Sequence, residues 1–493
     1  MTNITHKNAH NKIIDAFSYT HDNVGNRLTK TEEGIMPHAP DKTINYTYDA
    51  IYRLQTTEPE KRGKGKLAEA LNKYHTENYT YDVVGNRQSG PHSKDSYSYN
   101  AGNELITSTG RIIFERDNQY EYDLNGNLIK KTQTIKNKWK IITNYTYDDE
   151  NRLIEVRIQK GHKIKEVSFT YDPLGRRISK TVSREDFEDE DEEELDEDDK
   201  GKGKGKDDDK DKGKHGKPFQ PRTTYYVYDD QNVIAEYDEN NKLIASYVHG
   251  PNIDEPLSAK IKRDWIYYHA DGLGSITTLT SHMGNVVQRY EYDSFGNMSL
   301  KPHFIKQPFT YTAREFDPET GLYYYRARYY DAKTGRFITR DPIGFDGGDA
   351  NLYVYAGNNP VNWVDPLGLE LISLNDGIRI ANTAYTWIGM PYLYGGSSRK
   401  GIDCSHLVWI VYEETGFPYQ YTWTGSFPSD NKFQKVNTPQ EGDVILFSGH
   451  MGIYTSGIVI SAQSGAGKVT TCGINCFGPV KGYYRYDDEC KNK

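Results

Sequence analysis

Residues 120–130 read YEYDLNGNLIK, and residues 145–156 repeat the phrase as YTYDDENRLIEV. In both, two tyrosines one residue apart precede an aspartate, a glycine or asparagine follows, and an apolar run comes next. Tyr-x-Tyr is a period-2 pattern that places both rings on one face of a strand. The aspartate can bond its own backbone two residues on, and Gly or Asn suits the positive φ of a tight turn. Each copy therefore predicts a strand–turn–strand hairpin.

The phrase recurs between residues 46 and 297, and its quoted copies up to residue 177 start about 24 to 41 residues apart, a range in which repeat architectures are expected. Further copies are Tyr46–Asp49, Tyr79–Arg87, Phe169–Arg177 and Tyr290–Asn297. The chain has 493 residues with 41 Tyr against 16 Phe, and its apolar content is low for a globular protein. We therefore expect a core built from tyrosine, with rings packed and hydroxyls in water.

These phrases resemble the YD (tyrosine–aspartate) repeats of bacterial Rhs proteins, in which a spiralling β-sheet forms a hollow shell. Unrelated β-hairpins are the alternative, and the number of copies disfavours it. The resemblance implies YD repeats over residues 1–182 and 219–308. This length is short for a closed shell, so an N-terminal portion is expected to be missing or to be supplied by another chain. The resemblance implies a shell-forming partner or a secretion apparatus as candidate partners.

Residues 183–218 separate the two blocks of repeats and predict a disordered insertion at a hairpin tip. Within them, residues 185–217 carry 17 acidic and eight basic residues, which accounts for the whole net charge of −9. Such a segment buries too little apolar surface to offset the entropy of ordering. The rest of the chain is balanced, so the sequence lacks the basic footprint of a nucleic-acid-binding protein.

The stretch 309–369 ends in two Asp-Pro-x-Gly phrases, at Asp341 and Asp365. It closely resembles the Rhs-associated core, which closes the shell and precedes a variable C-terminal effector. The resemblance implies an aspartyl self-protease with Asp341 and Asp365 as carboxylates, Arg328 as the supporting arginine, and a cut after Leu369. Two nearby carboxylates can split their pKa values into an acid and a base. The alternative is that each phrase is only a type I turn.

The sequence changes character after Leu369 and suggests a separate domain over residues 370–493. Residues 375–388 have apolar residues at helical spacing, and a second helix is expected over Ser405–Thr415. Cys404 would stand at the start of that helix, where the N–H groups and dipole favour the thiolate. His450 opens a predicted strand, and it could act as general base toward the thiol.

The DCS and GD…HxGIY phrases resemble those of NlpC-type papain-like cysteine peptidases, which cleave the stem peptides of peptidoglycan. The resemblance implies that Asp403 and Ser405 line a site for the free amine of the stem peptide, and that Tyr392 lies near the nucleophile. His406 departs from the family, which usually has glycine there. The third catalytic residue is usually a second histidine; here Gln463 or Ser461 could replace it, and Gln463 has the longer reach.

Cofactor, metal and disulfide predictions follow from the four cysteines. Cys472, Cys476 and Cys490 have no clustered histidines, so they make a poor zinc site. A disulfide and reduced thiols both fit them. We therefore expect no cofactor and no metal.

The fold class expected is a multi-domain chain, with an all-β YD-repeat spiral sheet or shell followed by a small α+β papain-like cysteine peptidase domain. The expected function is that of a secreted Rhs-type toxin that hydrolyses peptidoglycan peptides after self-cleavage, with a cognate immunity protein as partner. The N-terminus lacks the apolar segment of a Sec signal peptide and no span suits a transmembrane helix, so a dedicated export system is expected. Two alternatives remain: a papain-like acyltransferase, deamidase or peptidase acting on host protein, and a non-catalytic glycan-binding surface protein.

Overall fold

The structure is a computed structural model, and the account below concerns the residues that it describes. These are residues 3–22, 25–33, 42–60, 76–91, 95–110, 116–135, 138–185, 220–250, 253–298, 305–369, 372–373, 376–415, 417–437, 439, 442–455 and 457–486. Of the predicted insertion 183–218, the first three residues end strand β14 and the rest lie outside the described residues.

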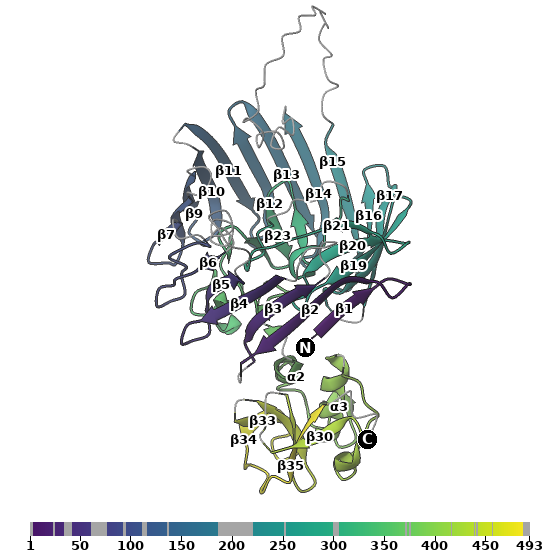
Figure 1. The fold of residues 1–493 in the computed structure, drawn as a ribbon. Helices are drawn as coiled ribbons and strands as arrows, with labels where there is room; N and C mark the ends of the chain where they lie inside the picture. The colour runs from purple at the N-terminus through teal and green to yellow at the C-terminus, as the bar shows by residue number, and fades with distance from the viewer. Residues whose placement is uncertain are drawn as a thin grey trace, which may run out of the picture.

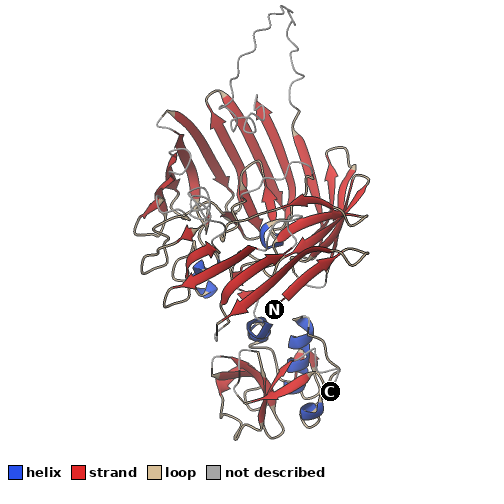
Figure 2. Ribbon diagram, viewed as in Figure 1, coloured by secondary structure: helices blue, strands red, loops and turns tan. Residues whose placement is uncertain are grey.

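Two antiparallel sheets make up most of the chain (Figures 1 and 2). In both, each strand pairs with its neighbours in sequence, as a succession of hairpins requires. The six-stranded sheet comprises β1 (Asn3–Lys7), β2 (Ile13–His21), β3 (Arg27–Glu33), β4 (Lys42–Tyr48), β5 (Leu54–Pro59) and β6 (Glu77–Asn78). The 15-stranded sheet comprises β7 (Ser96–Tyr99), β8 (Leu105–Gly110), β9 (Arg116–Tyr122), β10 (Leu128–Ile135), β11 (Trp139–Tyr147), β12 (Leu153–Lys160), β13 (Lys163–Tyr171), β14 (Arg177–Glu185), β15 (Arg222–Asp229), β16 (Asn232–Asp238), β17 (Leu243–His249), β18 (Pro256–Ile261), β19 (Asp264–Ala270), β20 (Ile276–Ser281) and β21 (Val286–Arg289).

The aspartate of each repeat forms the predicted turn. Asp148 Oδ1 accepts the backbone N–H groups of Glu150 at 3.0 Å and of Arg152 at 2.9 Å, and Asn151 takes a φ of 60°. In the preceding repeat, Gly126 occupies the equivalent position with a φ of 83°. These bonds satisfy turn N–H groups that no ladder reaches, so the same hairpin recurs wherever the phrase does.

The tyrosines do build the core, but their hydroxyls are not all in water as the composition predicted. The second tyrosine of a repeat donates its hydroxyl to a backbone carbonyl of the repeat before it. Tyr147 bonds the carbonyl of Leu128 at 2.8 Å, and Tyr171 that of Leu153 at 2.6 Å. The hydroxyl therefore joins successive hairpins, and this bond explains why phenylalanine is not an equivalent residue here.

The first sheet meets the last strands of the large sheet along a polar seam. Lys30 of β3 forms an ion pair with Asp271 at 2.9 Å, and Arg27 donates to the carbonyl of Gly272 at 2.6 Å. These two contacts join residues that are 241 and 245 positions apart in the sequence. The succession of strands therefore curves round until its beginning meets its end, as in a spiral shell. Figure 1 shows β1–β3 directly below β19–β21 in this view.

The segment 305–369 packs against the hairpins of the 15-stranded sheet. Its four-stranded sheet comprises β22 (Glu315–Asp317), β23 (Leu322–Tyr325), β24 (Arg328–Asp331) and β25 (Arg336–Phe337). Arg177 of β14 donates to Asp317 at 2.5 Å and to Glu315 at 2.9 Å, with all three side chains buried. This segment fills the interior of the shell and holds the first candidate site.

The C-terminal domain is a six-stranded sheet with helices packed on it (Figure 1). Helix α3 lies against β32 and β33, and their contact surface is the apolar core that includes Leu407, Val411, Ile453 and Ile460. The strand order is β30-β35-β31-β32-β33-β34. The elements are α2 (Asp376–Tyr385), β28 (Ser397–Ser398), β29 (Gly401–Ile402), α3 (Cys404–Glu414), β30 (Phe433–Val436), β31 (Val444–Leu446), β32 (Met451–Thr455), β33 (Ile458–Gln463), β34 (Lys468–Gly473) and β35 (Gly482–Tyr486).

One short ladder crosses the predicted boundary at residue 369. Strand β26 (Trp363–Val364) pairs with β27 (Ile372–Ser373) in an antiparallel arrangement. The second Asp-Pro-x-Gly phrase and Leu369 therefore lie between the two paired strands. The domain bounds given above remain predictions.

Candidate active sites

The first candidate site is built around Arg328, which begins β24 and is 4% exposed. Its Nη2 lies 2.9 Å from Asp341 Oδ2 and 3.2 Å from Asp365 Oδ2, so one guanidinium joins both predicted carboxylates. The guanidinium also stacks 3.7 Å from the centroid of the Phe337 ring. The structure thus brings together the three residues that the sequence singled out.

The predicted cut position lies in the same cluster. Asp365 Oδ1 accepts the backbone N–H of Leu369 at 2.9 Å, and Arg328 Nε donates to the carbonyl of Gly368 at 2.5 Å. A Cβ atom placed on Gly347 would lie 2.8 Å from the Leu369 carbonyl oxygen and 3.0 Å from Asp341 Oδ2. The Leu369 carbonyl, which precedes the predicted cut, therefore lies close to the Asp341 carboxylate. Both groups adjoin the space that a side chain on Gly347 would occupy.

The electrostatics of this cluster distinguish its two carboxylates. Burial raises the pKa of Asp341, and the nearby charge of Arg328 offsets part of that rise. Burial also lowers the pKa of Arg328, against the opposite effect of Asp365 and Asp341. Asp365 is 2% exposed and paired with the guanidinium, an arrangement that favours its ionised form. A small cavity opens on this cluster, and Asp349 and Asn351 are among its lining residues.

The second candidate site lies at the N-terminus of α3. Asp403 caps the helix by accepting the backbone N–H of His406, and Cys404 is its first residue. Burial raises the pKa of the Cys404 thiol; the backbone N–H of Met451 and the hydroxyl of Thr424, 3.8 Å away, offset only part of this rise. The sequence predicted a thiolate favoured by the helix N-terminus. The structure differs, because desolvation outweighs the N–H groups.

His450 precedes β32, next to the residue whose backbone faces the thiol. Its ring lies against Phe477, with ring centroids 3.8 Å apart, and burial lowers its pKa to about 4. Nε2 is buried without a hydrogen-bond partner among the described residues, and no hydrogen bond there joins the ring to Cys404. The predicted pair is therefore close in the fold, but no hydrogen bond joins its two side chains among the described residues.

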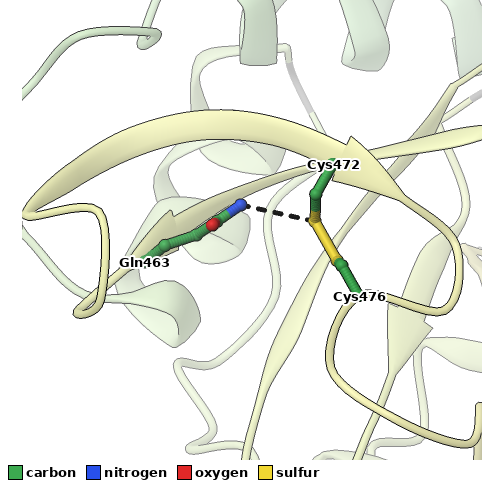
Figure 3. The surroundings of a disulfide bond; sticks show 3 residues. All are labelled: Gln463, Cys472 and Cys476. Carbon is green, nitrogen blue, oxygen red and sulfur yellow. Dashed lines mark hydrogen bonds between the residues drawn. A yellow bond between two sulfur atoms is a disulfide. The ribbon is translucent and has the colours of Figure 1, made fainter.

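Neither predicted third residue is bonded to His450 in this structure. Gln463 donates from Nε2 to the sulfur of Cys472 at 3.4 Å (Figure 3). Ser461 is fully buried, and its hydroxyl lacks a partner in the part of the chain that the structure describes. Because residues of a strand alternate between its faces, Ser461 and Gln463 lie on one face of β33.

Cys472 and Cys476 form a disulfide, which decides between the two alternatives that the sequence left open. Cys490 lies outside the described residues. The disulfide links Cys472 of β34 to Cys476 in the turn that follows the strand (Figure 3). Phe477 comes next in the sequence. The disulfide therefore anchors the segment that covers His450.

The residues predicted to bind substrate form a polar network beside Cys404. Ser405 Oγ donates to Asp403 Oδ1 at 3.0 Å, and the Ser405 and Tyr421 hydroxyls are 3.0 Å apart. Burial raises the pKa of Tyr392, and Cys404 and Asp403 add to that rise, which places Tyr392 near both. Backbone and side-chain hydrogen bonds from His406 lower the pKa of Asp403, against the effect of burial.

Three residues in these sites were not singled out from the sequence. Gly347 carries no chemical group, Phe477 lies well downstream of His450, and Thr424 is in a loop. Of these three, only Gly347 belongs to a recognisable sequence pattern, the Gly-Gly pair at residues 347–348. That pattern predicts a turn and does not indicate a functional site.

Within the described part of the chain, His, Cys, Asp and Glu side chains form no group of three that could hold a metal ion. No helix there combines the length and apolar character needed to cross a membrane.

Comparison with family models matches two parts of the chain. The Teneurin YD-shell model matches residues 5–186 and 209–361, and the NlpC/P60 model matches residues 389–478. These matches correspond to the repeat sheets with their core and to the C-terminal domain, respectively.

Curated relatives cover the larger part. The double-stranded DNA deaminase toxin A of Burkholderia cenocepacia (strain H111) is 29% identical over 66% of this chain and 22% of its own length. The tRNA nuclease WapA of Bacillus subtilis (strain 168) is 30% identical over 62% of this chain and 11% of its own length. The chain thus spans about a tenth to a fifth of the length of these two relatives.

Two solved structures are also similar to parts of this chain. The TcdB2-TccC3-TEV crystal structure is 16% identical over 74% of this chain and 20% of that chain, with a TM-score of 0.33. The NlpC/p60 domain of the peptidoglycan hydrolase SagA is 26% identical over 22% of this chain and 97% of that chain, with a TM-score of 0.20. Because the Teneurin YD-shell model matches more than half of the chain, the chain belongs to that family, and it carries a C-terminal domain that matches the NlpC/P60 family model.

Proposed function

We propose that this toxin carries out two hydrolyses in succession. The core cuts the chain after Leu369, and the freed C-terminal domain then hydrolyses peptide amide bonds in peptidoglycan stem peptides. The observation that carries the first step is the single guanidinium of Arg328, which holds Asp341 and Asp365 together beside Leu369.

The self-cleavage uses the two carboxylates in different protonation states. Asp365, ionised beside Arg328, accepts a proton from water as the water oxygen bonds to the Leu369 carbonyl carbon. Asp341, whose pKa burial raises, supplies the proton that the leaving nitrogen of Glu370 takes as the C–N bond breaks. The products are a carboxyl group on Leu369 and an amine on Glu370. Turn formation alone would not require a buried arginine between the two aspartates.

The cysteine site acts as a general-base pair. Because burial raises the pKa of Cys404 and lowers that of His450, both groups are neutral at rest. His450 takes the thiol proton as Sγ attacks the substrate carbonyl, and it returns the proton to the amine that leaves. Water then hydrolyses the thioester. For this the imidazole turns from Phe477 toward Sγ, and the unpartnered hydroxyl of Ser461 favours Ser461 over Gln463 as the residue that orients it.

The biological setting of the proposal follows from the toxin family. Export by a dedicated system, action in the target-cell periplasm or cell wall, and a cognate immunity protein that blocks the cleft fit a toxin of this kind. The named activities of its relatives, on DNA and on tRNA, belong to those proteins. The C-terminal domain here matches a different family model, so a different reaction is proposed.

The test is mass spectrometry of purified peptidoglycan after incubation with the full chain. We expect new peptide fragments that are absent with the Cys404→Ala chain. The same two chains are incubated with protein substrates in parallel. Cleavage of protein but not of peptidoglycan would replace the proposed substrate with host protein. Identical digests from both chains would contradict a cysteine peptidase.

A further inference from the structure

The carboxylate beside the nucleophile has nearly all its hydrogen-bonding capacity in use. Asp403 Oδ1 accepts the His406 backbone N–H at 2.9 Å, the His406 ring Nδ1 at 3.0 Å and the Ser405 hydroxyl at 3.0 Å. Oδ2 accepts the Gly395 backbone N–H at 2.9 Å. Three donors therefore crowd Oδ1 and one meets Oδ2, which leaves about one lone-pair site, on Oδ2, for a further donor. Asp403 is also only 8% exposed, so a further donor has little access.

The hydroxyl of Ser405 is engaged in the same way. It donates its proton to Asp403, so its contact with the Tyr421 hydroxyl at 3.0 Å must be one that it accepts. The ring of Tyr421 stacks on that of His406, with centroids 4.2 Å apart and planes 17° apart. His406 and Tyr421 therefore cover Asp403 and Ser405 together.

An ammonium group would have to displace these donors to bind here. A free peptide amine needs an accessible carboxylate oxygen, and the imidazole N–H of His406 already holds Oδ1. Replacing the His406 N–H with an ammonium group loses a charge-assisted hydrogen bond and separates the stacked rings of His406 and Tyr421. A peptide with a free amine should therefore bind with little more affinity than one with a neutral amide at the same place.

We propose that His406 and Tyr421 close the amine subsite, so that this peptidase acts on peptides whose amino end is acylated or continues into a longer chain. The inference rests on the proposed cysteine peptidase function and specifies its substrate class. It departs from the free-amine site that the family resemblance implies. His406 is a specificity-determining residue in this account, and Tyr421 holds it in position.

The test compares one stem tetrapeptide in two forms, with a free α-amine and N-acetylated, as substrates of the full chain. We expect wild-type kcat/KM values for the two forms within about threefold of each other. His406→Ala should raise the preference for the free amine about tenfold, through a lower KM for that peptide alone. His406→Gln keeps a side-chain donor for Asp403 and should retain the wild-type ratio.

A second variant keeps the test valid if His406→Ala does not fold. Tyr421→Phe removes only the hydroxyl that occupies Ser405 and should shift the ratio in the same direction by about threefold. A wild-type preference for the free amine above about tenfold, or an unchanged ratio in His406→Ala, would overturn the inference and leave the peptidase function standing. If the wild type cleaves neither peptide although iodoacetamide alkylates Cys404, the peptidase function fails, and the inference fails with it.

Discussion

The aspartate cluster of the core and the cysteine site of the C-terminal domain differ in how far their groups are already joined. In the core, Arg328 bonds both carboxylates, and the Leu369 backbone donates to Asp365. In the C-terminal domain, His450 lies against Phe477 and makes no hydrogen bond to Cys404 among the described residues. The core cluster already contacts Leu369, after which we propose that it cuts, whereas the cysteine site would act on another molecule.

This contrast bears on the protonation of the two sites. In the core, Arg328 pairs with Asp365 and offsets part of the rise that burial causes in the pKa of Asp341, and a buried carboxylate without such a partner would be strongly destabilising. At the cysteine site, the Thr424 hydroxyl and the Met451 N–H only partly offset the rise that burial causes in the pKa of Cys404. His450 Nε2 has no hydrogen-bond partner among the described residues, and burial lowers the pKa of its imidazole. Self-cleavage should therefore depend on pairing, and peptide hydrolysis on a proton transfer that begins only with substrate.

The largest effect is expected at the cysteine site. Cys404→Ala and His450→Ala should each lower kcat/KM for stem peptides roughly 10³-fold or more, since neither residue activates the reaction alone. The measurement is the initial rate of amine release from a stem peptide. Because the core is untouched, both variants should still yield the fragment that begins at Glu370. If a variant retains more than about a tenth of the wild-type activity, the substituted residue is not catalytic.

Gly347→Ala should slow self-cleavage roughly 100-fold, because its Cβ would lie 2.8 Å from the Leu369 carbonyl oxygen and 3.0 Å from Asp341 Oδ2. The band intensities of full chain and fragment over time measure it. Gly348→Ala is the neighbouring control: its Cβ meets nothing within 4 Å, although its φ of 83° strains the backbone. Equal rates in the two variants would show that Leu369 is not held against Asp341.

The third member of the cysteine site gives an intermediate effect. Ser461→Ala should reduce kcat about tenfold, since we propose that its hydroxyl orients the imidazole and no other partner engages it among the described residues. Gln463→Ala should change kcat less than about twofold, because its amide contacts the disulfide sulfur. Steady-state kinetics of both variants decide between them. The opposite order of effects would assign the role to Gln463.

The smallest effect at neutral pH concerns Phe477. The base must be neutral, and burial lowers the pKa of His450 to about 4, so kcat/KM should fall only as the pH drops toward that value. Phe477→Ala exposes the imidazole and should move this acidic limb up toward 6.5, with little change at pH 8. Profiles of kcat/KM against pH for both chains test this. Coincident acidic limbs would show that Phe477 does not control the imidazole.

A structural feature could be predicted from the sequence where its hydrogen-bond partners are close in the sequence. The repeat hairpins were predictable, because Asp148 and Asn151 build each turn from neighbouring residues. The hydroxyl bond from Tyr147 to Leu128 was not, since it joins one repeat to the one before. A period-2 pattern tells which face a tyrosine occupies, but not which carbonyl lies above it.

The two sites show the same limit. Arg328, Asp341 and Asp365 were named from a family resemblance, and the fold brings them within one guanidinium's reach. The protonation of Cys404 was mispredicted, because a helix N-terminus is visible in sequence while the depth of burial is not. Phe477 was missed for a related reason, since the fold and the Cys472–Cys476 disulfide place it on His450.

The central claim is that one chain contains two separate hydrolytic sites, and intact-mass analysis of four purified full-length chains tests it most directly. The wild type and Cys404→Ala should each yield a fragment of residues 370–493, while Asp341→Asn and Asp365→Asn should remain whole. Asparagine preserves the size of each side chain, so folding measured by circular dichroism should be retained. A whole Cys404→Ala chain would show that the cysteine peptidase makes the cut. A fragment starting more than a few residues from Glu370, or normal cleavage in both asparagine variants, would contradict the account.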